Sequence, residues 1–206
     1  MSKPEEIAVR HRIDYTGAKM GMWIFLFTEV LFFGGLFLLY SVFRSKYTLA
    51  FHDSAKELDI FLGTANTVIL LTSSMMMALS ILFVRKGEKT SSILCQGITI
   101  FLGLVFLVNK YIEWSAHIHH GIYPDSPMLI QMSRGKIIFF SLYYVMTGLH
   151  GLHVFIGVCV ISGTLLFTAK GRIHRDDFVK LENTGLYWHF VDIVWIYLFP
   201  LFYLIT

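Results

Sequence analysis

Two histidines lie inside one of the most apolar stretches of the chain. His150 and His153 occur in the segment TGLHGLHVFIG, within an apolar run from Ile137 to Phe167. Their i, i+3 spacing puts both imidazoles on one face of a helix, and the glycines Gly148 and Gly151 would let another helix approach closely. Buried imidazoles need polar partners. The candidates are the other polar groups within apolar runs: Glu29, Asn66, Glu113, His189 and Asp192.

These residue types allow several chemistries. Three histidines with nearby carboxylates could ligate a haem or a metal, but a di-iron bundle needs Glu-x-x-His pairs on two helices, and that spacing does not occur. Glu29 and the imidazoles could instead relay protons, since imidazoles change charge near neutral pH. A third interpretation is passive: the polar groups bond across helices and leave an apolar cleft for lipid. Hydrolase motifs and the inverted repeats of transporters are not visible. A structural, lipid-associated or proton-handling membrane subunit is therefore favoured over an enzyme.

Composition limits the class of protein. Apolar residues make up 55% of the 206 residues, which is typical of a polytopic membrane protein. The formal charge of +3 comes from short loops, so we expect no nucleic-acid partner. Cys95 and Cys159 lie in apolar runs without Cys-x-x-Cys spacing, and we interpret both as small core residues. Residues 1–19 contain no apolar segment with a cleavage site, so we expect no removable signal.

Five stretches are long enough to cross a bilayer as helices: roughly 20–43, 60–84, 93–111, 137–167 and 186–205. We predict an all-α fold, in which residues 20–206 form a single bundle of five transmembrane helices and residues 1–19 an N-terminal segment. The side of the membrane that contains this segment holds eleven Lys and Arg residues, and the other side holds six. This asymmetry predicts a cytoplasmic N-terminus and an outward C-terminus.

The membrane location leads to specific expectations for several side chains. Glu29 should be neutral or paired, because an ionised carboxyl is costly in hydrocarbon. His189 and Asp192 are spaced i, i+3 and suit a local hydrogen bond. Asn66 and Thr67 are interpreted as helix-packing groups. Other polar groups belong to loops. The outer-loop histidines, His117, His119 and His120, are expected to be solvated. The inner-loop cations, Lys170, Arg172 and Arg175, could hold lipid phosphates.

The motifs together resemble a known family. The segments KMGMWIFLFTEVLFFGGLF, the pair Asn66-Thr67, TGLHGLHVFIG and YWHFVDIVWIYLFPLFY are similar in order and spacing to subunit III of the haem-copper oxidases, of the cytochrome c oxidase type. The resemblance extends over nearly the whole chain from Lys19. It is to the short form of five helices, which lacks two N-terminal helices of longer members.

The resemblance implies an accessory subunit of a respiratory terminal oxidase that reduces oxygen to water and translocates protons. Such a subunit carries no redox centre or metal; haem and copper reside in partner subunits. It packs against catalytic subunit I in a complex with subunit II, with cytochrome c as electron donor. It holds phospholipid in a helix cleft, sustains proton uptake into subunit I and protects the complex from inactivation during turnover.

Individual residues match the family's positions. Glu29 corresponds to the intramembrane carboxylate associated with carbodiimide reactivity, and Glu113 to the acidic residue after the third helix. The family's paired histidines and its last-helix pair correspond to His150, His153, His189 and Asp192. We expect Glu29 to contact His150 or His153 and to remain protonated at neutral pH.

The chain differs from the family pattern at residues 36–42, where many members of the family have a Trp and a His near bound lipid. Lys170, Arg172 and Arg175 are therefore the expected headgroup contacts. A quinol-oxidase subunit III, or the related protein associated with nitric oxide reductase, is the alternative within the family. An independent haem- or metal-binding membrane protein is the alternative from another class. The expected location is a bacterial inner membrane.

Overall fold

The computed structural model describes residues 3–119, 121, 123, 126, 129 and 131–204, with side chains from Tyr15 onward, and most of these residues are helical. Its helices are α1 (Lys3–Lys46), α2 (Thr48–Ala55), α3 (Ile60–Lys86), α4 (Lys89–His119), α6 (Arg134–Ala169) and α7 (Val179–Tyr203). Five of the described helices are long and apolar enough to cross a membrane. The predicted all-α class with five transmembrane helices is confirmed.

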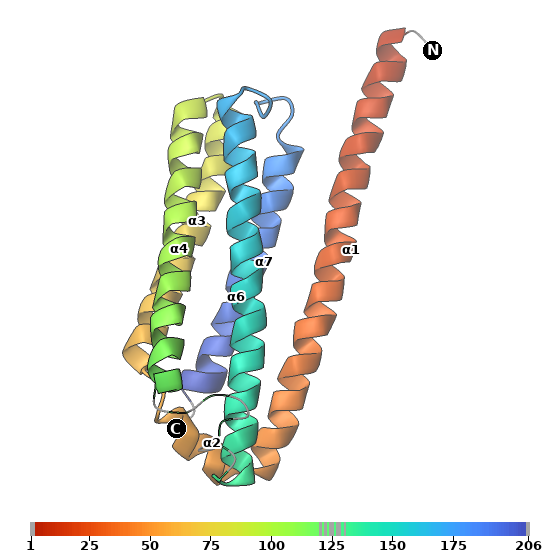
Figure 1. Cartoon of the computed structure of the whole chain (residues 1–206). Coiled ribbons are helices and arrows are strands. Elements are labelled where there is room, and N and C mark those ends of the chain that lie inside the picture. Colours follow the sequence, from red (N-terminus) through yellow and green to blue (C-terminus); the bar gives the residue numbers. More distant parts are fainter. Residues whose placement is uncertain are drawn as a thin grey trace.

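Four of these helices form a bundle, and α1 stands to its side (Figure 1). Within the bundle α4 packs against α3 and α6, and α7 packs against the same two helices. Helix α1 contacts α6 and α7 more sparsely, and α2 lies across one end of the bundle against α6. We name the two ends of the bundle by buried acidic residues: the Glu113 end, where α4 and α7 finish, and the Glu182 end, where α7 begins.

The helices are longer than the apolar runs predict. Helix α1 already begins at Lys3, because residues 3–19 contain helix-forming side chains and their one proline, Pro4, lies in the first turn, where it is tolerated. Helix α4 extends to His119, so His117 and His119 belong to its last turn rather than to a loop. Helix α2 was not predicted, because eight residues are too short for a periodicity signal. His120 and Ile205 lie outside the described residues.

Helix α3 illustrates how local sequence fixes the ends of a span. Asp59 caps its first turn, accepting hydrogen bonds from the backbone N–H groups of Phe61 at 2.8 Å and Leu62 at 3.2 Å. Gly87 ends the helix with a φ of +83°, a conformation that favours glycine. The span from Ile60 to Lys86 is therefore set by its caps as well as by its hydropathy.

Trp188 is the side chain around which the bundle packs. It is fully buried, and its indole Nε1–H donates to Ser73 Oγ on α3 at 3.0 Å. The ring fits because glycines face it: a Cβ atom built on Gly157 of α6 would lie 2.8 Å from the ring, and one on Gly103 of α4 would lie 2.9 Å from it. A glycine on α4 and another on α6 thus make room for this large side chain of α7.

The glycines beside the histidines behave differently from each other. A Cβ on Gly148 would lie 3.1 Å from the Trp114 ring of α4, which fits the expected close approach. Gly151 has no atom within 4 Å of such a Cβ and faces open space. Only one of the two predicted contact glycines therefore makes a helix contact in this chain.

We expect Gly157→Ala to lower the free energy of unfolding by about 1–3 kcal/mol, because the new methyl group overlaps a rigid indole in a packed core. Gly151→Ala is the matched control on the same helix and should leave stability unchanged or slightly raised. Unfolding by denaturing detergent, followed by circular dichroism, measures both. Equal stability of the two variants would contradict this account of Trp188.

Candidate functional site

Glu29 and His153 form a polar pair between α1 and α6. The His153 Nε2 atom lies 3.2 Å from Glu29 Oε2, and His153 Nδ1 lies 2.8 Å from the Leu149 carbonyl oxygen. A carbonyl only accepts, so Nδ1 must carry a hydrogen. In a neutral imidazole Nε2 is then an acceptor, and the contact with Glu29 requires one further proton on either partner. The pair therefore has the geometry to hold one shared proton.

The pair is partly shielded from its surroundings. The Glu29 side chain is 18% exposed and the His153 side chain 15%. The Phe33 ring packs edge-on against the imidazole, with ring centroids 5.2 Å apart. The Tyr187 hydroxyl donates to the His153 backbone carbonyl at 3.1 Å, which connects α7 to the same site. Three helices thus fix the position of the imidazole.

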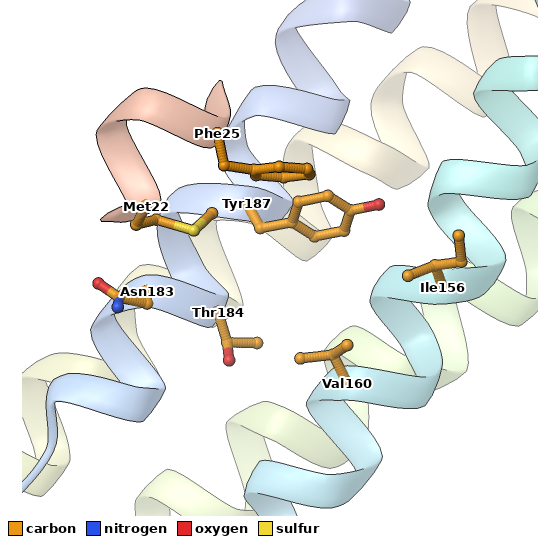
Figure 2. Close-up of a pocket in the computed structure, with 7 residues that line it drawn as sticks. All are labelled: Met22, Phe25, Ile156, Val160, Asn183, Thr184 and Tyr187. Carbon is orange, nitrogen blue, oxygen red and sulfur yellow. The ribbon is translucent and has the colours of Figure 1, made fainter. Parts of the chain in front are cut away.

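Apolar cavities open beside this pair. One of about 280 Å³ is lined by side chains of α1 and α7, with Ile156 and Val160 of α6 facing them (Figure 2). The rings of Phe25 and Tyr187 lie next to each other in it, with centroids 6.1 Å apart. A second cavity, also about 280 Å³, lies between α1 and α7 near Phe33. We call the two together the α1 groove. Its lining is almost wholly apolar, which suits hydrocarbon chains.

His150 does not share this site, although it lies on nearly the same helix face as His153. It is fully buried in the bundle, where its ring packs against Phe106 and Trp195 with centroids 5.5 and 5.2 Å away. Neither ring nitrogen has a hydrogen-bond partner in the described structure. Of the two expected contacts of Glu29, the structure therefore shows the one with His153.

Glu113 lies in a dense buried polar cluster at the Glu113 end. Its carboxylate accepts hydrogen bonds from Lys110 Nζ at 2.9 Å, the Tyr143 hydroxyl at 2.7 Å and the Tyr203 hydroxyl at 2.5 Å. Lys110 also donates to both tyrosines, at 3.1 and 2.8 Å. Lys110 and Glu113 are only 6% and 3% exposed. This cluster joins α4, α6 and the end of α7.

Sequence reasoning missed three members of this cluster. These are Lys110, Tyr143 and Tyr203. The i, i+3 spacing of Lys110 and Glu113 was an available signal for an ion pair. The two tyrosines come from distant helices, and nothing local in the sequence points to them.

His189 and Asp192 do not form the expected local hydrogen bond. His189 Nδ1 lies 2.6 Å from Ser74 Oγ on α3. The Ser74 hydroxyl lies close to the Asp192 side chain as well, yet neither carboxyl oxygen of Asp192 has a hydrogen bond. The partner of His189 is therefore a serine of α3 and not Asp192.

Asn66 and Thr67 both make contacts between helices. Asn66 Oδ1 accepts from Asn109 Nδ2 of α4 at 2.9 Å, and Thr67 Oγ1 accepts from the Trp195 indole of α7 at 3.0 Å. Two adjacent residues of α3 thus bond to two different neighbours.

The Glu182 end contains a second ionic cluster that the sequence did not reveal. Glu182, which is 7% exposed, pairs with Lys19 of α1 at 2.8 Å and with Arg85 of α3, and it accepts a hydrogen bond from Tyr15 at 3.1 Å. Lys170, Arg172 and Arg175 lie nearby in the chain, exposed in the loop between α6 and α7.

No group of three or more His, Cys, Asp or Glu side chains that could hold a metal occurs in the part of the chain that the structure describes. Cys95 is buried, as expected of a core residue, whereas Cys159 is exposed on α6, so its assignment to the core is wrong.

Fold and site together define a polytopic, all-helical membrane protein with polar contacts between its helices. Residues 6–206 match the family described as cytochrome c oxidase subunit III. The chain is 31% identical to "Cytochrome c oxidase subunit 3" of Thermostichus vulcanus, over 100% of this chain and 96% of the relative. It is 30% identical to "Quinol oxidase subunit 3" of Bacillus spizizenii, over 90% and 85% of the two chains.

A third relative is "Heme-copper oxidase subunit I+III" of Aeropyrum pernix, which is 32% identical over 91% of this chain and 22% of its own length. The chain therefore belongs to the cytochrome c oxidase subunit III family, which confirms the family resemblance. It is a subunit III of a haem-copper oxidase of the cytochrome c or quinol type.

The Glu113 cluster yields a stability prediction. We expect Lys110→Met to lower the free energy of unfolding by about 3–5 kcal/mol, because it leaves a buried carboxylate without its cation. Adding Glu113→Gln should recover part of this loss, since no unpaired charge then remains. Denaturing-detergent titration measures both effects.

Lys136→Met is the matched control, because Lys136 pairs with Glu57 near the same end but in a partly exposed position. Its loss should be about 1 kcal/mol or less. Equal losses for the two lysine variants would mean that the burial of Lys110 has no energetic consequence.

Proposed function

We propose that this chain is an accessory subunit that carries no redox centre, packs against catalytic subunit I and stabilises it. The haem and copper centres then belong to partner subunits, with subunit II in the same complex. The subunit I+III relative supports this partner, because there a sequence similar to this chain is part of the same polypeptide as subunit I. Covalent fusion is favourable only where the two parts can occupy one complex.

We propose that the α1 groove binds phospholipid. Its walls are apolar over about two turns of α1 on either side of Glu29, and lipid chains are the apolar ligands that a membrane supplies. Lys170, Arg172 and Arg175 lie at the end of α6, where lipid phosphates are expected, and all three are exposed. These cations are proposed to hold the headgroups.

The Glu29 and His153 pair is the observation on which the proposed role in proton uptake depends. A contact that needs one shared proton, placed between an apolar groove and a helix bundle, can store a proton without ionising an isolated group. We propose that this pair supports proton uptake into subunit I. Glu113, His150, His189 and Asp192 are proposed to complete the intramembrane polar set, and Asn66 with Thr67 to fix helix register.

We infer the membrane orientation from the distribution of charge. Lys and Arg are concentrated in the N-terminal segment and in the loops at the Glu182 end. We therefore propose that the Glu182 end faces the cytoplasm of a bacterial cell and that the C-terminus faces outward. We propose that other subunits bind the electron donor, cytochrome c or quinol. The relatives include oxidases of both types.

The class of complex is tested by purification in mild detergent. We expect a tagged chain to co-purify with a haem-copper catalytic subunit, whose other partners identify the electron donor. The separated chain should show no haem absorbance and no stoichiometric metal. A stoichiometric chromophore on the separated chain would instead identify an independent haem or metal protein.

The role of the pair is tested in the intact complex. We expect Glu29→Gln to shorten the active lifetime during turnover several-fold, because an amide cannot exchange the shared proton. Glu57→Gln, which alters a partly exposed carboxylate paired with Lys136, is the control and should leave the lifetime unchanged. Oxygen consumption recorded until activity is lost gives the lifetime. Parallel behaviour of both variants would reject a proton-handling role for Glu29.

A further inference from the structure

A polar pocket lies at the Glu182 end, on the side of α7 that faces α3. It has a volume of about 260 Å³ and is lined by Lys19, Ile81, Arg85, Glu182, Leu186 and His189. Three of these side chains carry charge, so the pocket suits water at the level of the lipid headgroups. His189 is its deepest polar residue along α7, about two turns beyond Glu182.

From His189 a polar contact leads into the bundle. Its Nδ1 atom lies 2.6 Å from Ser74 Oγ, and Asp192, one helical turn beyond His189 on α7, lies close to the same hydroxyl. Asp192 is 3% exposed, and neither of its oxygens has a hydrogen bond of standard geometry. Every other described carboxyl within the membrane spans has a hydrogen-bonding partner: Glu29, Glu113 and Glu182. Asp192 is therefore the exception that needs an explanation.

We infer that the pocket, His189 and Ser74 form a proton-exchange route that connects the Glu182 end to Asp192. A hydronium ion in the pocket gives a proton to Nε2 of the His189 ring and becomes water, and Nδ1–H passes a proton to the Ser74 oxygen. The Ser74 hydroxyl proton then passes to the Asp192 carboxylate. The hydronium ion loses one proton and one O–H bond forms on Asp192, so the transfer balances and reverses by the same steps.

The geometry favours a route over a purely structural carboxyl. A structural carboxyl in hydrocarbon is expected to have its oxygens bonded, as those of Glu113 are. Asp192 has instead a hydroxyl close by, which is itself bonded to an imidazole that reaches a charged pocket. Serine can both donate and accept, so Ser74 can alternate between its two neighbours.

The route is separate from the Glu29 and His153 pair. It runs between α7 and α3, whereas that pair joins α1 to α6. The charged groups that line its entrance come from α1, α3 and α7, namely Lys19, Arg85 and Glu182, and no residue of α6 lines the pocket. The route uses residues of this chain alone, so it does not depend on the partners or the electron donor proposed above.

Isotope labelling makes the proposal testable in the full chain, reconstituted in lipid nanodiscs. Asp192 is the one aspartate of the sequence within the five membrane spans, so carbon-13 labelling of aspartate carboxyl groups marks it selectively. We expect an isotope-shifted infrared band of a protonated carboxyl at neutral pH, absent from Asp192→Asn. In deuterated buffer the band should shift as the proton exchanges.

The variants decide the route. Ser74→Ala and His189→Phe should each slow the exchange by roughly tenfold or more, because each removes one step of the transfer. Ser74→Thr retains the hydroxyl and should keep the normal rate. Ser80→Ala, on the same helix but bonded to Ser92, is the control for loss of a buried serine. A band that exchanges at the same rate in every variant, or no aspartate band in the unmodified chain, would overturn the proposal.

Discussion

The structure depends on one constraint: hydrocarbon offers no hydrogen-bond partner, so a polar side chain within the bundle must find one in the protein, on its own helix or on a neighbouring one. Glu113 shows the constraint fully met, since a lysine and two tyrosines from α4, α6 and α7 surround one carboxylate. Glu182 shows it met at the opposite end, by side chains of α1 and α3. These two clusters hold the helices at both ends, while Trp188 and its facing glycines fix their spacing between them.

The functional interest lies where the constraint is met incompletely. The contact between His153 and Glu29 becomes a hydrogen bond only when one of the two side chains gains a proton. The carboxyl group of Asp192 has no hydrogen bond, although the Ser74 hydroxyl lies close to it. Both differ from Glu113, whose partners already supply enough hydrogens. An incompletely bonded group can change its protonation state with little rearrangement, whereas ionisation of a fully bonded cluster would break several contacts. The same physics therefore separates polar groups that hold the fold from those that can exchange protons.

The sequence predicts the spans well and the pairings poorly, for different physical reasons. Hydropathy reports whether a segment can lie in hydrocarbon, so five spans were recognisable, and helix ends were blurred only where polar turns continue the helix, as in α1. Spacing reports which residues share a face but not which helix that face meets. His150 and His153 share a face, yet the first meets Phe106 in the bundle and the second meets Glu29 of α1. The partners of Ser74, Tyr143 and Tyr203 could not be predicted for the same reason, since they lie on helices that are far away in the sequence.

Helix α1 shows how far sparse contacts can define a position. It stands beside the bundle with most of its apolar side chains exposed, and of its described residues only Leu26, Phe33 and Tyr40 are buried. Polar contacts are added at three depths: Lys19 with Glu182, Glu29 with His153, and the Tyr40 hydroxyl with the Leu201 carbonyl. That carbonyl lies in the last turn of α7. Because the middle contact needs a shared proton, the placement of α1 and the protonation of Glu29 and His153 are thermodynamically linked: whatever holds α1 in place, lipid or a partner subunit, also favours the protonated pair.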